Sequence, residues 1–418
     1  MMETEIKNKN YLGINSLGRI GKLSLWNHLV TRHFDGVVIN IGRKTGKNIE
    51  AMIQALENDS TYGNLGNFLY GQKSRKDVIK VIDSEKFIFD IDGMMVKVLT
   101  EERDPAKIPW KEEQVQLVLD CTGKFVDPTV SIDSPKGSLR GHLAGGARKV
   151  IVSAPFKIKD AEKQTPTDSI MMVYGINHIE YDPQKHDVIS AASCTTTGLS
   201  HMIKPLMEDR YTSKILTASM STVHAATNTQ SVLDSLPKAG ASDLRKTRSV
   251  FNNIILSTTG AAKALESIIP EIQEIGFMAD SVRIPTTTVS LITLNITFNS
   301  GLDEKGNPII NRQHINNIYK TAAAGSQKGL LVFSDRQNVS ADLTGYKAAV
   351  VIEGSENHTR TGFIKLPAET VKSFGIKNPV DMNIPVTHAK IFGWYDNEFG
   401  SYVNLLEKLT VYVDQYLH

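Results

Sequence analysis

A strand, turn, helix and strand in succession near the start of the chain constrain the fold more than any other feature. The apolar run at residues 11–15 leads into Gly18 and Gly21, and apolar residues then recur at helical spacing over residues 20–30. A second apolar run follows at residues 37–39. Two parallel strands need a crossover of this length, which is usually a helix. The pattern therefore predicts a doubly wound α/β domain built on a parallel sheet.

Further apolar runs extend this expected sheet. Two short runs, residues 87–91 and 95–98, flank an Asp-Gly pair, which tolerates the positive φ angles of a tight hairpin turn. Two more runs, residues 115–119 and 150–152, end at small and polar residues. A doubly wound sheet binds its ligand beyond the carboxyl ends of its strands, so we expect a binding site there.

The second half of the chain has a different pattern. From about residue 188, long strand-like runs follow at residues 215–223 and 287–298, which predicts a second, mainly antiparallel sheet in an α+β domain. Apolar residues at helical spacing over residues 402–416 predict a C-terminal helix that packs on the first domain. Two segments stay unassigned, residues 127–141 and 335–389.

Composition narrows the class of function. The 418 residues include 47 basic and 45 acidic side chains, so no global field favours nucleic acid or an anionic membrane. Residues 1–10 lack the apolar core of a signal peptide, and no long uncharged apolar run occurs elsewhere. Only Cys121 and Cys194 are cysteines, without a spacing suited to a structural zinc site. We expect a cytoplasmic protein without metal, nucleic-acid or membrane partners.

The glycine turn is suited to a dinucleotide but incomplete. Gly18 and Gly21 allow backbone amides at a helix start to approach a pyrophosphate, whereas Ser16 stands where the fingerprint has its first glycine. A purely structural turn stays an alternative. Ile41 occupies the position of the carboxylate that normally holds the ribose, and the basic residues Arg43 and Lys44 follow and could pair with a 2′-phosphate, so NADP is open beside NAD. A solvated basic loop explains the same residues.

Cys194 is a candidate nucleophile. It follows a strand-like run, and a helix start just after it is expected to expose the thiol and lower its pKa. His224 ends an apolar strand 30 residues later and is a candidate base. The alternatives are a small buried cysteine and a structural histidine; Cys121, after its own apolar run, is interpreted as packing.

Five motifs in order carry a resemblance to a known family. Chain segments 13–21, 192–196, 222–225, 257–264 and 394–400 resemble the phosphorylating glyceraldehyde-3-phosphate dehydrogenase family. Shorter similarities cover residues 58–63, 102–105 and 282–286, so that the resemblance spans most of the chain outside the two unassigned segments.

The resemblance implies a fold, a cofactor and a reaction. It implies a Rossmann-type NAD(P)-binding domain at residues 1–192, completed by a C-terminal helix at 396–418, a catalytic domain at 193–395, and a homotetramer. Cys194 would attack the aldehyde of glyceraldehyde 3-phosphate and hold the oxyanion with its backbone N–H. His224 would lower the thiol pKa and accept the hydroxyl proton as hydride leaves for NAD or NADP. Inorganic phosphate would then cleave the thioester.

The resemblance also implies binding residues. For the cofactor these are Asn15, Gly18, Arg19, Ile20, Gly21, Ile41, Arg103, Thr122, Ser153 and Asn397. The substrate phosphate would be held by Thr227 and Arg283, and the attacking phosphate by Ser193, Thr195, Thr259 and Gly260, with added charge from Arg245 or Arg248.

Several departures from the family pattern leave alternatives open. A Thr-Gly pair at residues 197–198 replaces the usual Asn-Cys, and residues 400–402 reorder the usual Gly-Tyr-Ser. Extra residues fall around 42–48, 127–141, 156–169 and within 335–389. An erythrose-4-phosphate or other sugar-phosphate aldehyde dehydrogenase, or a non-catalytic paralogue that binds nucleotide or a partner, therefore competes with the phosphorylating enzyme. Neither the physiological direction nor the cofactor preference follows from the sequence.

Overall fold

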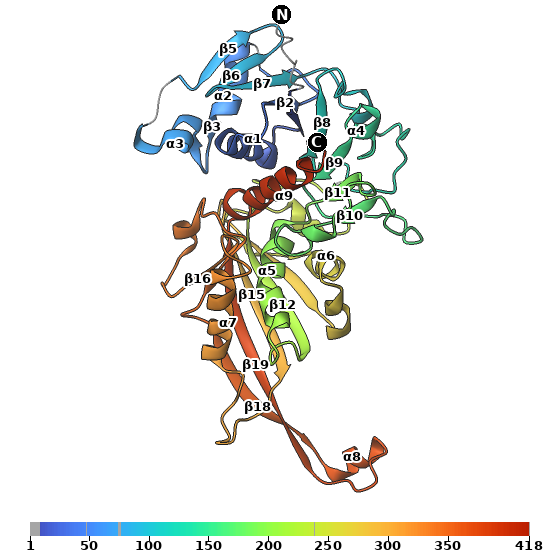
Figure 1. Ribbon diagram of the computed structural model, residues 1–418, viewed down its shortest axis with the longest axis vertical. Coiled ribbons are helices and arrows are strands. Elements are labelled where there is room, and N and C mark those ends of the chain that lie inside the picture. The colour runs from blue at the N-terminus through green and yellow to red at the C-terminus, as the bar shows by residue number, and fades with distance from the viewer. Residues whose placement is uncertain (1–8, 47, 74–76, 238, 418) are drawn as a thin grey trace, which may run out of the picture. The chain divides into compact units, whose positions relative to one another are not determined.

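The computed structural model describes residues 9–46, 48–73, 77–237 and 239–417, which divide into two compact units (Figure 1). The first unit runs to Ser193 and takes in the chain again from Tyr402, and the second is Cys194–Ser401. The assignment of cofactor binding to the first unit and of catalysis to the second stays a prediction. Residues 1–8, on which the expected absence of a signal peptide rests, lie outside the described residues.

A nine-stranded sheet is the centre of the first unit. Its strand order is β10-β11-β9-β8-β1-β2-β7-β6-β5, and all pairs from β10 to β7 are parallel. The strands are β1 (Tyr11–Asn15), β2 (Gly36–Asn40), β5 (Ile79–Asp83), β6 (Ile88–Ile91), β7 (Met94–Leu99), β8 (Val115–Asp120), β9 (Lys149–Val152), β10 (Ser169–Met171) and β11 (Val188–Ser190). The predicted doubly wound parallel sheet is confirmed, and so is the hairpin turn between β6 and β7, where Asp92 and Gly93 have φ of 52° and 83°.

Helices of the first unit bury their apolar side chains. α1 (Arg19–Thr31) buries Leu23, Trp26 and Leu29 and packs against α9 (Asn404–Asp414), as predicted for the C-terminal segment. Val30, predicted on the apolar face of α1, is 48% exposed instead. The remaining short elements are α2 (Ile49–Glu57), β3 (Asn58–Asp59), β4 (Gly63–Asn64), α3 (Leu65–Tyr70) and α4 (Gly141–Ala144).

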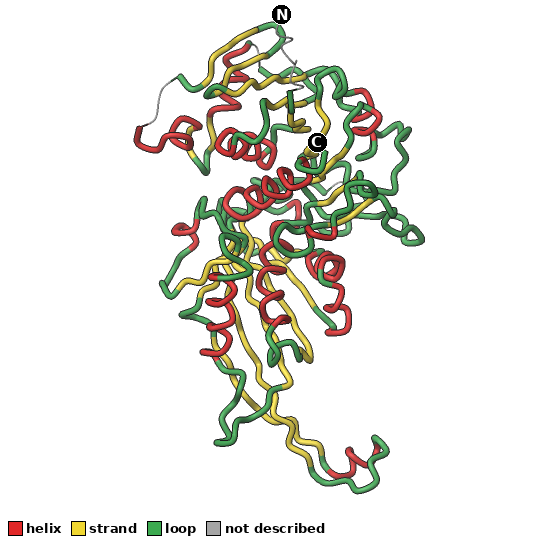
Figure 2. Tube along the Cα trace, in the orientation of Figure 1, coloured by secondary structure: helices red, strands yellow, loops and turns green. Residues whose placement is uncertain are grey.

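The second unit is built on an eight-stranded mixed sheet (Figure 2). Most of its pairs are antiparallel, as predicted, while β12 pairs with β14, and β16 with β17, in parallel. Its strands are β12 (Ile215–Ala225), β13 (Ile255–Thr258), β14 (Met278–Ile284), β15 (Ser290–Asn299), β16 (Leu331–Ser334), β17 (Val350–Glu353), β18 (His358–Leu366) and β19 (Met382–Tyr395). The strand predicted from residue 287 begins three residues later because Val289 has φ of 65°, outside the extended region.

One layer of helices packs on this sheet. α5 (Cys194–Glu208) contacts β15, β17 and β19, and it also contacts α6 (Ala261–Ile268) and α7 (Arg312–Ala324). Buried and partly exposed residues alternate along β15, as expected for a sheet covered on one face. The unassigned segment 335–389 contains β17, β18, the short helix α8 (Ala368–Ser373) and the start of β19, where β18 and β19 form a long hairpin.

Candidate active site

Cys194 and His224 lie within contact of each other, as the sequence predicted. Cys194 is the first residue of α5, and His224 lies near the end of β12. The Cys194 Sγ atom is 3.5 Å from the His224 Nε2 atom. Cys194 is partly buried and His224 is only 2% exposed. The arrangement is that of a nucleophile beside a base.

Arg283 is the third member of this cluster. Strands β12 and β14 are parallel neighbours, and their register sets His224 directly beside Arg283. The Arg283 guanidinium donates through Nη1 to His224 Nδ1, and the same Nη1 lies 3.2 Å from the carbonyl oxygen of Ala225. His224 Nδ1 is also 2.8 Å from that carbonyl oxygen. A positive charge therefore adjoins both the imidazole and the thiol.

The charges of the cluster differ from the prediction. Burial, reinforced by the charge of Arg283, lowers the pKa of His224 to about 3, so the imidazole is neutral at pH 7. Burial raises the pKa of the Cys194 thiol, against the opposing effect of Arg283. The net direction is opposite to the prediction for the helix start, because desolvation of the thiolate outweighs the lowering effect of the hydrogen bonds from Thr195 and Cys194. The effect of His224 on the thiol pKa stays a prediction.

Tyr395, at the end of β19, is a site residue that the sequence analysis missed. Its side chain is 1% exposed, and its hydroxyl is 2.9 Å from Thr195 Oγ1 and 2.8 Å from Thr222 Oγ1. Its ring stands edge-on to the His224 ring with centroids 6.0 Å apart. Tyr395 thus ties the start of α5 to β12. The signal was present, since Tyr395 lies in the segment 394–400 that carried the resemblance.

Only some of the residues predicted to bind phosphate lie at the cluster of Cys194, His224 and Arg283. Thr195 is buried and bonded to Tyr395, and Arg283 is bonded to His224. Thr227 Oγ1 is 2.9 Å from Thr229 Oγ1. Arg245 pairs with Asp243 and Arg248 with Asp234, both as exposed ion pairs rather than at the cluster. Thr259 Oγ1 accepts from the N–H of Ala261, Gly260 precedes α6, and Ser193 precedes α5. The phosphate roles of these residues stay predictions.

In the first unit, the turn between β1 and α1 is shaped for close approach of a ligand. Ser16, which replaces a glycine of the fingerprint, has φ of 92°. A Cβ atom on Gly21 would lie 1.9 Å from the carbonyl oxygen of Ser16, so only glycine fits there. Gly18 caps α1 without a side-chain hydrogen bond, and the first turn of α1 has no acidic residue. The helix dipole at this point favours an anion.

A cavity of about 670 Å³ adjoins this turn at the carboxyl ends of β1, β2 and β8. Five residues predicted to bind the cofactor line it, namely Asn15, Gly18, Ile41, Arg103 and Thr122. Within the described chain its lining leaves out Arg19, Ile20, Gly21 and Ser153. The Arg19 side chain pairs with Asp59 instead, and the guanidinium of Arg103 donates through Nε to the Gly42 carbonyl at 2.9 Å. The cavity, the glycine turn and the dipole of α1 fit a dinucleotide.

A buried polar network fixes the floor of this cavity. Asp120 accepts through Oδ2 from Asn15 Nδ2 and His142 Nε2, each at 3.0 Å, and through Oδ1 from Thr122. Trp110 Nε1 donates to His142 Nδ1 at 3.0 Å, which leaves the ring proton of a neutral His142 on Nε2. Asn15 Oδ1 accepts in turn from Asn40 at 2.9 Å. Asp120 and His142, both fully buried, were not predicted as site residues.

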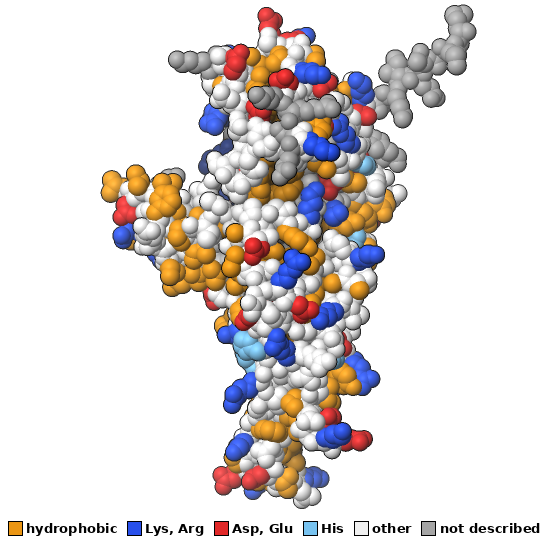
Figure 3. Space-filling model, turned by 90° about the vertical axis from the view of Figure 1, so that its left-hand side faces the viewer, with side chains coloured by type: hydrophobic (Ala, Val, Ile, Leu, Met, Phe, Trp, Pro, Cys, Tyr) orange, Lys and Arg blue, Asp and Glu red, His pale blue; other side chains and the backbone are white. Residues whose placement is uncertain are grey.

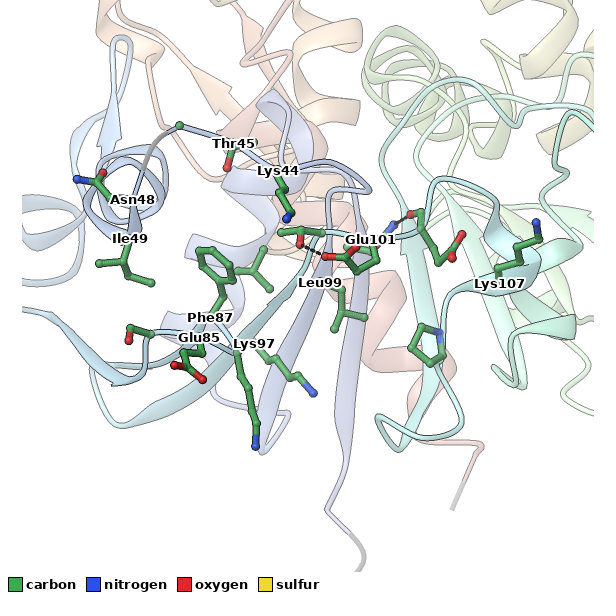
Figure 4. Close-up of a pocket in the computed structure, with 18 residues that line it drawn as sticks. Lys44, Thr45, Asn48, Ile49, Glu85, Phe87, Lys97, Leu99, Glu101 and Lys107 are labelled. Atoms are coloured by element: carbon green, nitrogen blue, oxygen red, sulfur yellow. Dashed lines mark hydrogen bonds between the residues drawn. The ribbon is translucent and has the colours of Figure 1, made fainter.

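A second cavity, of about 740 Å³, shares Asn40 and Thr45 with the first (Figure 4). Its lining includes lysines and glutamates, among them Lys44, Lys97 and Glu101. Arg43 lines the first cavity and Lys44 the second, and both side chains are exposed. The predicted basic pair therefore lies beside the two cavities, at the end of β2.

Asn397 Oδ1 accepts from the Ser290 hydroxyl at 3.0 Å, and its contact with the cofactor stays a prediction. Burial and the charge of Asp120 raise the pKa of Cys121 to about 12, as expected for a packing residue. In the described part of the chain, no three His, Cys, Asp or Glu residues are grouped to hold a metal, and no helix is long and apolar enough to span a membrane.

The geometry defines a class of protein. The chain combines a doubly wound α/β unit, with a cavity at the carboxyl ends of its strands, and an α+β unit in which a cysteine at a helix start lies beside a histidine. This combination is typical of cysteine-dependent NAD(P) dehydrogenases. Two family models match the chain: the NAD binding domain of glyceraldehyde 3-phosphate dehydrogenase at residues 10–128, and the C-terminal domain of the same enzyme at residues 193–370.

Individual relatives agree with the models. The chain is 32% identical to glyceraldehyde-3-phosphate dehydrogenase 2 of Streptomyces avermitilis over 97% of this chain and 99% of the relative. It is 37% identical to glyceraldehyde-3-phosphate dehydrogenase of Streptomyces coelicolor over 78% and 80%, and 32% identical to glyceraldehyde-3-phosphate dehydrogenase 1 of Bacillus subtilis over 96% and 97%. The chain belongs to the glyceraldehyde-3-phosphate dehydrogenase family, which confirms the resemblance, and it is an NAD(P)-dependent phosphorylating dehydrogenase.

Proposed function

We propose that this protein oxidises glyceraldehyde 3-phosphate to 1,3-bisphosphoglycerate, in glycolysis or gluconeogenesis, through a thioester on Cys194. The observation that carries the proposal is the 3.5 Å approach of Cys194 Sγ to His224 Nε2, with Arg283 in the same cluster. The names of the relatives support the same substrate.

Cys194 forms and later breaks the covalent bond. Its sulfur attacks the aldehyde carbon while the thiol proton passes to the aldehyde oxygen. That oxygen of the resulting hemithioacetal lies near the start of α5, where the backbone N–H of Cys194 is a donor. An incoming phosphate oxygen then attacks the thioester carbon and the carbon–sulfur bond breaks. The sulfur takes the proton that His224 had accepted, so the thiol is regenerated, and the proton of the phosphate is released to water. The energy of the thioester is retained in the acyl phosphate.

His224 is the general base. Its Nε2 accepts the hydroxyl proton of the hemithioacetal as the carbon is oxidised, which requires a neutral imidazole. Burial and Arg283 support that state, since they keep the pKa of His224 low. The nicotinamide of bound NAD or NADP supplies the hydride acceptor. Asn15, Gly18, Arg103 and Thr122, which line the 670 Å³ cavity, would hold the cofactor.

Two anion sites are part of the proposal. Thr227 and Arg283 would bind the substrate phosphate, because a guanidinium matches phosphate oxygens. The attacking phosphate would meet Ser193, Thr195, Thr259 and Gly260, with Arg245 or Arg248 drawn in from its exposed ion pair.

We also propose a cytoplasmic homotetramer, on the resemblance alone. Light scattering after size-exclusion chromatography tests the assembly.

The test is the initial rate of cofactor reduction with glyceraldehyde 3-phosphate, with NAD and NADP run separately, each with and without inorganic phosphate or arsenate. We expect phosphate-dependent turnover in the wild type and none in Cys194→Ser. A rate that is independent of phosphate would favour a hydrolysing aldehyde dehydrogenase. Absence of turnover in a folded protein with a titratable Cys194 thiol would contradict the proposal.

A further inference from the structure

The hairpin of β18 and β19 extends beyond the rest of the sheet in the second unit (Figure 1). β15 pairs with β19 only from Val386 onward, and in the described part of the chain β18 pairs with no strand other than β19. The end of the hairpin therefore consists of these two strands alone, and we call residues 362–386 the arm. The arm lies within segment 335–389, where the chain is longer than the family pattern, so the resemblance assigns it no role.

One face of the arm is wholly apolar. Side chains alternate between the two faces of a strand, and the register sets Ile364 opposite Ile384. The residues on this face, which we call the arm face, are Gly362, Ile364, Leu366, Met382, Ile384 and Val386. None of them is buried, and Met382 is 39% exposed. The opposite face includes the paired polar residues Lys365 and Asn383, so the apolar surface belongs to one side of the arm.

The tip of the arm is folded and holds the two strands together. α8 lies there, and its Val371 is only 1% exposed. The N–H of Ala368 donates to the carboxylate of Asp381 at 2.8 Å, which closes the tip. Hydrophobic side chains are exposed at this end of the second unit (Figure 3). A two-stranded hairpin is marginally stable in water, so covering the arm face would stabilise the arm.

The arm face continues onto the side of the sheet that lacks the helix layer. Along β19, Ala389 and Ile391 are buried on the side toward α5. Lys390, Phe392 and Trp394 alternate with them and are only partly buried. A partly exposed surface therefore runs from the arm face along β19 to Trp394, and we call its part outside the arm the open sheet face.

The charged groups of the open sheet face form two sets of opposite sign. Arg360 and Lys390 lie next to the arm. Farther along, Glu353 and Glu356 line a cavity of about 340 Å³ beside Trp394. Glu353 is 3% exposed, and among the described residues its carboxylate accepts hydrogen bonds from three neutral groups and pairs with no cation. A buried carboxylate without a counter-charge favours a cation from a binding partner.

We propose that the arm face of each copy packs against a second copy of this chain, related to the first by a two-fold axis. The inference names a contact surface for the assembly that is part of the proposed function. An isologous contact uses the same surface on both copies, so the basic pair of one copy can meet the acidic cavity of the other, and the reverse. The charges of the open sheet face thus complement those of an identical surface.

The size of the surface favours a second copy over a small partner. The arm face exposes roughly 300 Å², at the area typical of half-exposed aliphatic side chains. A stable contact buries about 800 Å² on each partner. The partner must therefore cover the open sheet face as well as the arm, and a second copy presents a rigid surface of that extent.

The first test compares two neighbouring positions on opposite faces of the arm. Ile364→Asp places a carboxylate in the arm face, and we expect the dissociation constant of the assembly to rise at least about tenfold. Phe363→Asp is the matched control, because Phe363 is 52% exposed but lies on the opposite face, and its assembly should match the wild type. Light scattering after size-exclusion chromatography over a dilution series measures this, and circular dichroism verifies folding. An assembled wild type with the same dissociation constant as Ile364→Asp would overturn the proposal.

The second test locates the contact without disrupting it. Photoreactive benzoylphenylalanine is placed at Met382, on the arm face, or at Asn383, on the opposite face, and the purified protein is irradiated. We expect a product of twice the chain mass on a denaturing gel from Met382 and at most a trace from Asn383. Peptide mass spectrometry should find the second attachment point in this same sequence. Equal yields from both positions, or no such product from Met382, would contradict the arm contact.

The outcomes separate the arm contact from the rest of the proposed function. An assembled wild type whose mass and cross-links are independent of the arm face contradicts the arm contact alone. A wild type that is monomeric at every concentration contradicts both the arm contact and the homotetramer. The phosphate-dependent rate of cofactor reduction tests the reaction separately, since neither Ile364 nor Met382 is among the residues assigned to it.

Discussion

The hydroxyl of Tyr395 lies 2.9 Å from the hydroxyl of Thr195, the residue that follows the nucleophile, although 200 positions separate them in the chain. The same tyrosine hydroxyl reaches Thr222 at 2.8 Å, two residues before His224. Through these two hydrogen bonds Tyr395 joins the helix that carries the thiol to the strand that carries the imidazole. The spacing of Cys194 and His224 therefore depends on a buried residue at the end of β19.

The first prediction concerns this bridge. Tyr395→Phe should lower the free energy of unfolding by about 1–3 kcal/mol, because the hydroxyls of Thr195 and Thr222 lose a partner while buried. Urea unfolding followed by fluorescence measures the loss. Tyr346→Phe is the control, since Tyr346 is 45% exposed in the same unit and should lose little. Equal midpoints for both variants would contradict the bridge.

The second prediction concerns the floor of the cofactor cavity. Asp120 accepts four hydrogen bonds through its two oxygens, from Thr122 twice and once each from Asn15 and His142. Asp120→Asn keeps the shape but leaves one acceptor oxygen, so the Asn15 amide loses its fixed orientation. We expect cofactor affinity to fall roughly tenfold, about 1.4 kcal/mol. Calorimetric titration with NAD and NADP measures this, and the exposed Asp160→Asn should bind as the wild type does.

The third prediction concerns the residue that replaces a fingerprint glycine. Ser16 has φ of 92°, a conformation that costs a residue with a Cβ about 1–3 kcal/mol. Ser16→Gly should therefore raise the melting temperature, with a net gain of about 1 kcal/mol after loss of the bond from Gly18 N–H to Ser16 Oγ. Ser16→Ala keeps the strain and loses that bond, so it should be less stable than the wild type. The reverse order of the two variants would contradict this account.

Local patterns predicted much of the fold, and pairings between distant segments account for what they missed. The periodicity of residues 11–39 was sufficient for β1, α1 and β2, and the thiol was correctly expected at the start of a helix. The contact between Arg283 and His224 depends on the register of β12 with β14, which lie 59 residues apart at this point. The pKa of Cys194 was predicted in the wrong direction because burial, which is set by the whole unit, outweighs the local helix start.

The fourth prediction follows from the two thiols. Burial raises the pKa of Cys194, so its thiolate fraction is small at pH 7 and grows as pH rises. Alkylation of Cys194 by iodoacetamide in the free protein should therefore accelerate steadily from pH 7 to pH 9. Cys121, with a pKa of about 12, should be labelled at least about tenfold more slowly in the native protein. Peptide mass spectrometry measures both rates, with Cys194→Ser to isolate Cys121; a plateau for Cys194 below pH 7 would indicate a preformed thiolate.

The fifth prediction concerns cofactor preference. Ile41 and Arg43 line the 670 Å³ cavity just after β2, where a carboxylate would hold the ribose of NAD and repel the extra phosphate of NADP. Ile41→Asp introduces that carboxylate, and we expect it to lower the ratio of kcat/KM for NADP to that for NAD by about tenfold or more. Arg43→Gln should lower the same ratio through the loss of a charge that pairs with the 2′-phosphate.

The control for both variants is Lys136→Gln, which removes an exposed positive charge elsewhere in the same unit and should leave the ratio unchanged. The two variants separate the effect of the added carboxylate from the effect of the lost positive charge. Ile41→Asp should improve kcat/KM for NAD, whereas Arg43→Gln should leave it nearly constant. If neither variant changes the ratio, the basic residues after β2 are a solvated loop, and the cofactor preference must arise from other residues of the cavity.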